Sequence, residues 1–203
     1  MSNKTATHRS MPVQYLTRIA VLAAMASILF LIEIPVIAFY KLDLSNLPVL
    51  LGAFSMGPGP GLLILLVKSL VGCLHTSSMY VGELADFLMG AAYILPAALV
   101  YQARRTKRGA VQGMILGTLC MIVVSVVVNK YLMIPFYMNA FGMPMEAVIG
   151  MAQSALPFVQ TEWQLLLYVT APFNLLKGVV ISVIAALIYK PLSPFLHVKR
   201  NGR

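Results

Sequence analysis

Charged residues are scarce in this chain of 203 residues. They make up 10% of the sequence, while 60% of the residues are apolar and the mean hydropathy is +0.86. An ordinary soluble domain is about 25% charged and about 45–50% apolar. A soluble protein of 22.1 kDa could not bury so much apolar surface, so lipid must be the solvent for most of it. This composition excludes a disordered protein, a disulfide-stapled secreted domain, a nucleic-acid-binding protein and a soluble enzyme.

Cysteines, histidines and catalytic motifs are also few. Cys73 and Cys120 lie inside apolar runs, where we expect small hydrophobic residues and neither a disulfide nor a metal site. His8, His75 and His197 have no metal-binding spacing. Walker A, H-E-x-x-H and G-x-S-x-G motifs are missing. The sequence therefore predicts no enzyme, no metal and no cofactor, and a chain that cannot power uphill transport itself.

Apolar runs separated by prolines, glycines and charges predict an all-α membrane protein with six transmembrane helices. The predicted helices span residues 15–34, 46–56, 61–75, 82–102, 109–134 and 163–188. The second and third are short and flank the helix-breaking sequence Gly57-Pro58-Gly59-Pro60-Gly61. Residues 46–75 therefore form two spans, which we favour, or a re-entrant hairpin. We expect a single membrane domain over residues 14–190, with tails at 1–13 and 191–203.

Basic residues gather on one predicted side of the membrane. With six spans both termini lie on the same side, and that side collects 11 of the 15 lysines and arginines but none of the six acids. These residues are Lys4, Arg9, Arg18, Arg104, Arg105, Lys107, Arg108, Lys190, Lys199, Arg200 and Arg203. Because cytoplasmic loops carry an excess of positive charge, we expect both termini to be cytoplasmic in a multi-pass protein of the bacterial plasma membrane.

A few polar side chains fall inside the apolar spans, where charges are costly. Asn174 and Lys177 are three residues apart and share one helix face. They form either a ligand clamp that opens to the outside or a structural pair, in which Lys177 meets Glu83 or Asp86 or extends to the interface. Asn129 favours binding when it is taken together with these two, although a single buried Asn commonly joins helices.

Further polar residues stand at the predicted outer side. Glu83 and Asp86 begin a span, where acids suit the helix dipole; we interpret Asp86 and Lys68 as structural. Leu42 and Asp43 belong to an outer loop, which ends in helix N-cap residues or closes over a ligand.

A stripe of small residues on the first span, containing Ala20, Ala24 and Ser27, allows a close helix approach, either within this bundle or to a partner.

Six segments together resemble the riboflavin-specific substrate-binding subunits of energy-coupling factor transporters. They are Leu42-Asp43-Leu44-Ser45-Asn46-Leu47-Pro48, Gly57-Pro58, Leu66-Val67-Lys68, Val81-Gly82-Glu83-Leu84-Ala85-Asp86-Phe87, residues 129–135, and Pro172-Phe173-Asn174-Leu175-Leu176-Lys177-Gly178. The resemblance covers about residues 14–190, and the last two segments are the most specific to riboflavin. Lys130 and Asp86 depart from the pattern, since an amide is expected in place of Asp86.

The resemblance implies a six-helix fold with riboflavin bound near the outer side, as cargo and not as a cofactor. Asn129, Asn174 and Lys177 would hold the flavin, with Leu42, Asp43 and Glu83 also at the site and a Tyr, Phe or Trp163 stacked on the ring. Ala20 and Ala24 would meet a transmembrane coupling subunit that carries two cytoplasmic ATPases. The alternatives are a stand-alone transporter, a subunit for another vitamin, and a purely structural membrane protein.

Overall fold

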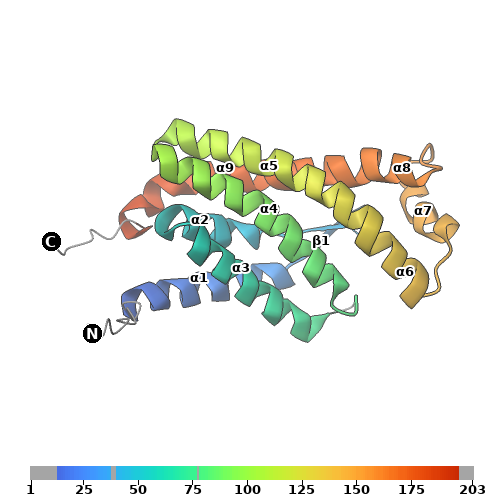
Figure 1. Ribbon diagram of the computed structural model, residues 1–203, viewed down its shortest axis with the longest axis horizontal. Helices are drawn as coiled ribbons and strands as arrows, with labels where there is room; N and C mark the ends of the chain where they lie inside the picture. Colours follow the sequence, from blue (N-terminus) through green and yellow to red (C-terminus); the bar gives the residue numbers. More distant parts are fainter. Residues whose placement is uncertain (1–12, 38–39, 77, 197–203) are drawn as a thin grey trace, which may run out of the picture.

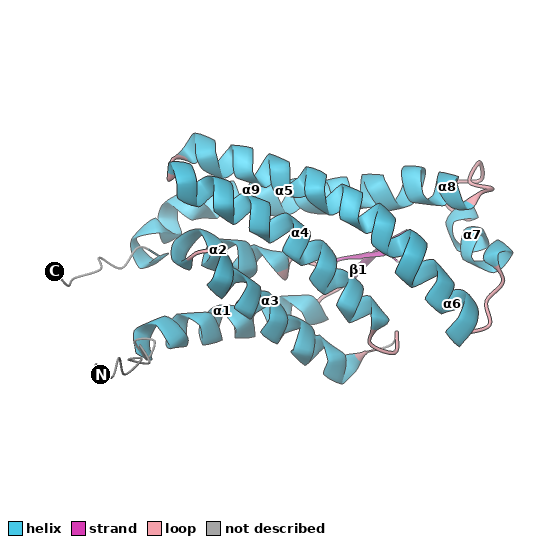
Figure 2. Cartoon of the chain, viewed as in Figure 1, coloured by secondary structure: helices cyan, strands magenta, loops and turns pink. Residues whose placement is uncertain are grey.

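A computed structural model describes residues 13–37, 40–76 and 78–196, with side chains up to residue 188. These residues form a bundle of helices with a short hairpin (Figures 1 and 2). Its helices are α1 Val13–Leu31, α2 Asn46–Met56, α3 Pro58–Gly72, α4 Val81–Arg104, α5 Lys107–Val128, α6 Ile134–Ala140, α7 Met145–Gln153, α8 Glu162–Leu165 and α9 Ala171–Leu196. A 3₁₀ turn, η1 (Cys73–His75), extends α3.

Two π-helical turns join shorter helices into long rods. The turn η2 (Asn129–Met133) links α5 to α6, and η3 (Leu166–Thr170) links α8 to α9. We expected a helix end at Pro135, which was wrong. Pro135 lies in the first turn of α6, where a missing backbone N–H is tolerated.

Five described helical segments are long and apolar enough to cross a membrane, whereas the sequence predicted six spans. They cover residues 13–31, 58–75, 81–104, 107–140 and 162–188. The sixth, α2, has 11 residues and is therefore only about 16 Å long. Nine of its residues, 46–54, are buried, and it packs against α1, α3, α4 and α9. The all-α membrane fold is thus confirmed, and α2 is a core helix surrounded by longer ones.

An antiparallel hairpin follows α1, where the sequence analysis predicted a helix to residue 34 and then a loop. Strand β1 (Ile34–Ile37) pairs with β2 (Tyr40–Leu42), with Ile34 opposite Leu42. Pro35, in the first strand, has no N–H to donate, which an edge strand tolerates. The main apolar core lies between α1, α2, α3, α4, α5 and α9. The hairpin brings Tyr40 against a second apolar cluster, which it forms with residues of α6 to α9.

The two ends of the bundle differ in charge. Figure 1 places the start of α1, the α2–α3 and α4–α5 turns and the end of α9 at one end. The described basic residues there are Arg18, Arg104, Arg105, Lys107 and Arg108. All six acids belong to the other half, with the hairpin, the start of α4 and α6 to α8. Lys4, Arg9, Lys199, Arg200, Arg203, His8 and His197 lie outside the described residues, as does the side chain of Lys190.

Helices α4 and α5 approach so closely that glycine is required between them. A Cβ on Gly117 would lie 2.3 Å from the carbonyl oxygen of Tyr93, and one on Gly113 would lie 2.5 Å from that of Ala97. We expect Gly117→Ala to lower the free energy of unfolding by about 1–3 kcal/mol, because the backbones must separate. Gly150→Ala is the matched control, since its Cβ would meet nothing within 4 Å. Thermal unfolding in detergent measures both, and equal melting temperatures for the two variants would contradict the prediction.

Candidate functional site

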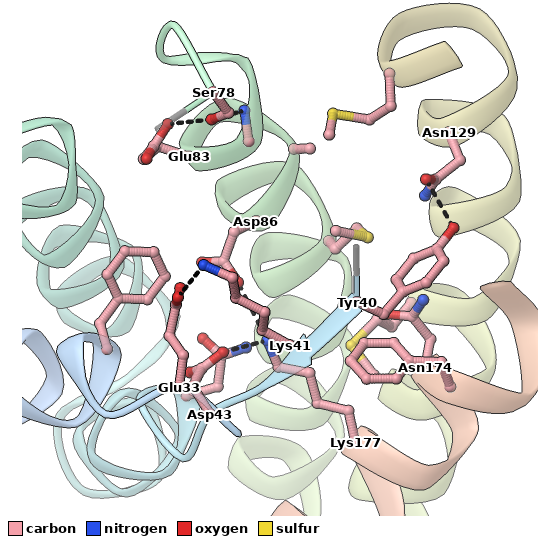
Figure 3. Close-up of a pocket in the computed structure, with 18 of the residues that line it drawn as sticks. Glu33, Tyr40, Lys41, Asp43, Ser78, Glu83, Asp86, Asn129, Asn174 and Lys177 are labelled. Atoms are coloured by element: carbon pink, nitrogen blue, oxygen red, sulfur yellow. Dashed lines mark hydrogen bonds and ion pairs between the residues drawn. The ribbon is translucent and has the colours of Figure 1, made fainter. Parts of the chain in front are cut away.

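A cavity of about 270 Å³ lies between the hairpin, the start of α4, η2 and α9. Figure 3 shows polar side chains from all four regions around it. Its apolar walls come from aromatic rings and methionines: Phe30, Tyr40, Tyr137, Phe173, Met89, Met121 and Met133. Such a wall is adaptable because methionine is flexible, and sulfur–aromatic contacts are favourable. The cavity is therefore suited to a flat apolar ring that presents a few polar atoms.

A buried network of charges closes one side of the cavity. Lys177 Nζ lies 2.8 Å from Asp43 Oδ2 and 3.2 Å from Asp86 Oδ1. Asp86 also pairs with Lys68, whose side chain is 0% exposed. Two ammonium groups thus balance two carboxylates, which is how charges can stay away from water. Of the structural alternatives that the sequence left open for Lys177, the structure shows the ion pair with Asp86 and adds one with Asp43.

The loop before α2 is tied into this network. Lys68 Nζ donates to Ser45 Oγ at 2.9 Å and to Asn46 Oδ1 at 3.1 Å. The Ser45 hydroxyl in turn donates to Asp43. The sequence left open that this loop ends in helix N-cap residues; Ser45 does stand at the N-cap position of α2, but its side chain makes no cap hydrogen bond. It instead holds the loop to Lys68.

Asp43 keeps its negative charge in this setting. Burial by itself would raise the pKa of the Asp43 carboxyl, but the ammonium groups of Lys177 and Lys68 and the hydrogen bonds from Lys177 and Ser45 lower the pKa below its ordinary value. The stability that this ion pair contributes is therefore present above about pH 4, the ordinary pKa of Asp, and is lost only as the pH falls through the lower, folded value. The loop stays attached to α9 throughout the physiological range.

The two buried asparagines lie on neighbouring rods, Asn129 at the start of η2 and Asn174 in the first turn of α9, just after η3. Asn129 Nδ2 donates to the carbonyl oxygen of Ser125 at 2.8 Å, and Asn174 Nδ2 donates to that of Thr170 at 2.9 Å. Each bond reaches back four residues beside a π-helical turn, a feature common at functional sites. Each amide group keeps a second N–H, so both asparagines can donate to a ligand in the cavity.

Tyr40 is a site residue that the sequence analysis missed. Its hydroxyl donates to Asn129 Oδ1 at 3.0 Å (Figure 3) and also forms a hydrogen bond with Thr170 Oγ1. Its ring centroid lies 5.0 Å from that of Phe173. Burial raises the pKa of Tyr40 above its ordinary value, so the hydroxyl remains a donor. Tyr40 reaches the site because it belongs to the hairpin, which the sequence did not predict. The sequence signal that could have pointed to Tyr40 is that it is an aromatic residue in a short outer loop.

Five of the six predicted ligand-binding residues line the cavity: Asp43, Glu83, Asn129, Asn174 and Lys177. Leu42 is the sixth, and it packs against the second apolar cluster instead. Lys130 and Trp163 are not among the lining residues. The Lys130 ammonium lies 3.5 Å from the centroid of the Trp163 ring, which is a cation–π contact, and Trp163 is 54% exposed.

The small-residue stripe on α1 borders a separate apolar groove. Ala20 and Ala24 are exposed, whereas Ala23 and Ser27 are buried. Leu63, Val67 and Val71 of α3 form the other side of the groove.

A family model described as "ECF transporter, substrate-specific component" matches residues 14–189. The chain belongs to this family. As a substrate-specific component of a transporter it is a membrane protein and not an enzyme, which confirms both predictions. The family implies a transported substrate and no cofactor.

Relatives and a solved structure agree with this family. The chain is 31% identical over 184 residues to "Riboflavin transporter RibU" of Staphylococcus aureus, a match that covers 89% of this chain and 91% of the relative. It is 27% identical over 198 residues to "Riboflavin transporter FmnP" of Bacillus subtilis, which covers 95% of this chain and 98% of the relative. A structure titled "Structure and mechanism of the S component of a bacterial ECF transporter" superposes with a TM-score of 0.70 at 31% identity, over 92% of this chain and 99% of that one. The resemblance read from the sequence motifs is thereby confirmed.

Proposed function

We propose that this substrate-specific component binds riboflavin in the cavity and delivers it for import. The observation that carries the proposal is the meeting of Asn129, Asn174 and Lys177 on one side of an aromatic and methionine-lined cavity. A flavin has a broad apolar ring, one edge of alternating acceptors and a donor, and a polyol tail. The names of the relatives in S. aureus and B. subtilis support the same ligand.

The polar groups suit the flavin edge. The second Nδ2 hydrogens of Asn129 and Asn174 and the third hydrogen of the Lys177 ammonium are suited to ring carbonyls, while asparagine oxygens are suited to a ring N–H. Asp43 would act by holding Lys177 and the loop in place, and Glu83 by accepting from polyol hydroxyls. Leu42 would contribute through hairpin packing. A small number of placed polar groups in an apolar slot is the usual form of a small-molecule site.

The transport assembly is part of the proposal. A single membrane domain over residues 14–190 would cross the bacterial plasma membrane six times, with the tails at 1–13 and 191–203 in the cytoplasm. The short α2 would make the second crossing together with the chain that precedes it, and α3 the third. The charge difference between the two ends of the bundle supports this orientation. A transmembrane coupling subunit with two ATPases would supply the energy, since the chain has no nucleotide motif.

Titration of the purified protein with riboflavin tests the binding claim. Flavin fluorescence should be quenched to saturation at one riboflavin per chain, and three unrelated vitamins should not compete. A preparation that leaves flavin fluorescence unchanged would overturn the proposal, and saturable binding of another vitamin in its place would identify a different cargo. Uptake by cells that lack the coupling subunits would instead support a stand-alone transporter.

The Tyr40 hydroxyl is expected to strengthen binding by holding the hairpin and Asn129 together. Tyr40→Phe keeps the ring against Phe173 but removes hydrogen bonds worth about 0.5–1.5 kcal/mol each. We expect the riboflavin dissociation constant to rise about threefold to tenfold. Tyr131→Phe removes a hydroxyl from a side chain that is 72% exposed and should leave the constant unchanged. If both variants bind like the unmodified chain, the hydroxyl has no such role.

The α1 groove should be needed for transport and not for binding. We expect Ala24→Trp to remove most riboflavin uptake by cells, because a large side chain prevents the close approach of a partner helix. Affinity of the purified variant for riboflavin should stay unchanged. Ala186→Trp, at an exposed alanine of α9, is the matched control and should transport normally. Full uptake by the Ala24 variant would place the partner elsewhere.

A further inference from the structure

Glu83 differs from the other carboxylates of the cavity. Its Oε2 accepts from the hydroxyls of Thr76 at 2.9 Å and Ser78 at 3.1 Å. Glu83 is only 8% exposed, and it forms no ion pair within the described part of the chain. Glu33, Asp43 and Asp86, by contrast, each pair with a lysine. Within the ranges that the structure describes, the side-chain partners of the Glu83 carboxylate are thus two hydroxyl groups.

The charges around the cavity do not cancel. Four carboxylates line it, those of Glu33, Asp43, Glu83 and Asp86. Lys41 and Lys177 line it as well, and Lys68 adds a third ammonium group through its ion pair with Asp86. One negative charge is therefore unbalanced, and the ion pairs assign it to Glu83. In such a buried place a charge acts more strongly than in water.

Glu83 lies across the cavity from the amide groups. In Figure 3, Glu83 and Ser78 stand on the α4 side, whereas Asn129 and Asn174 stand on the opposite side, on the rods of α5 and α9. If the ring edge meets the amides, as proposed above, the far wall receives the polyol tail. A hydroxyl at the end of that tail can donate to a carboxylate. A phosphate there carries about −1.5 to −2 charges at pH 7 and adds three acceptor oxygens, so it meets repulsion and no donor from the Glu83 carboxylate.

We propose that Glu83 is a specificity-determining residue that makes the cavity select a flavin whose tail ends in a hydroxyl and reject its phosphate ester. The inference rests on the proposed function, since it requires that riboflavin binds here. It goes further in assigning the end of the tail to one carboxylate and in predicting which flavins compete for uptake. Thr76 and Ser78 position the carboxylate by donating to its Oε2.

Titration with riboflavin and with flavin mononucleotide tests the proposal. The unmodified chain should bind the phosphate ester at least about tenfold more weakly, as expected for charge repulsion in a partly desolvated site. In Glu83→Gln the ratio of the two dissociation constants, ester to riboflavin, should fall to about threefold or less, chiefly because the ester binds more strongly. Glu146→Gln, which removes an exposed acid of α7 outside the cavity, should leave the ratio as in the unmodified chain.

The outcomes separate the two proposals. Equal affinity of the unmodified chain for both flavins, or an unchanged ratio in Glu83→Gln, overturns the role of Glu83 while riboflavin binding stands. No riboflavin binding by the unmodified chain overturns the proposed function itself. If Glu83→Gln does not fold, Glu83→Ala removes the same charge and should shrink the ratio in the same direction, and an unchanged ratio there also overturns the role.

Discussion

Asp86→Ala is expected to lower the free energy of unfolding more than any other single substitution considered above. Asp86 is the carboxylate that both buried lysines share, Lys68 on one side and Lys177 on the other. Without it, two ammonium groups remain for the single carboxylate of Asp43. Removing one partner of a buried ion pair costs about 3–5 kcal/mol, so the melting temperature in detergent should fall by roughly 6–20 °C.

A double variant separates charge from packing. Asp86→Leu combined with Lys68→Met removes one charge of each sign and fills the space with apolar atoms, which is often neutral or stabilising. It should recover most of the stability lost in Asp86→Ala. Glu146→Ala, at an exposed acid, should melt close to the unmodified chain. If Asp86→Ala melted like Glu146→Ala, the network would not hold the bundle together.

Asn174→Ala is expected to weaken riboflavin binding by about 1–3 kcal/mol, or about fivefold to 150-fold in the dissociation constant, because polar atoms of the bound flavin lose their partner. Stability should change little by comparison, since the side chain gives only one hydrogen bond to Thr170. Fluorescence titration gives the affinity and thermal unfolding gives the stability. Asn139→Ala, at an exposed amide of α6, is the matched control and should bind normally. A loss of stability with unchanged affinity would show a structural role for Asn174.

Much of the fold follows from the sequence because lipid imposes simple rules. Long apolar runs must form helices, so the predicted spans at 82–102 and 163–188 lie within α4 and within the rod of α8 to α9. The unequal distribution of charge follows from the positions of lysines and acids alone. The helix ends follow less well, because π-helical turns such as η2 carry a rod past Pro135, and nothing in local propensity marks them.

The candidate site was partly predictable for a similar reason. A charged or amide side chain at membrane depth must have a partner, which singled out Lys177 and Asn174, whereas Asp86 was interpreted as structural. Which partners meet depends on packing between residues far apart: Lys177 pairs with Asp43 across 134 positions and with Asp86 across 91. The role of Tyr40 depends on a hairpin of two short strands, which leaves no alternating pattern long enough to detect. Leu42 was predicted from the resemblance alone; it ends β2 and packs against the second apolar cluster, whereas Asp43, the residue after the strand, lines the cavity.

A crystal structure of the protein grown with riboflavin tests the central claim most directly. The account predicts density for the flavin ring within hydrogen-bond distance of Asn129, Asn174 and Lys177, with the polyol extending toward Glu83. Density for riboflavin elsewhere on the chain, with the cavity empty and these three side chains bonded only to Asp43, Asp86, Tyr40 and their own helices, would contradict it.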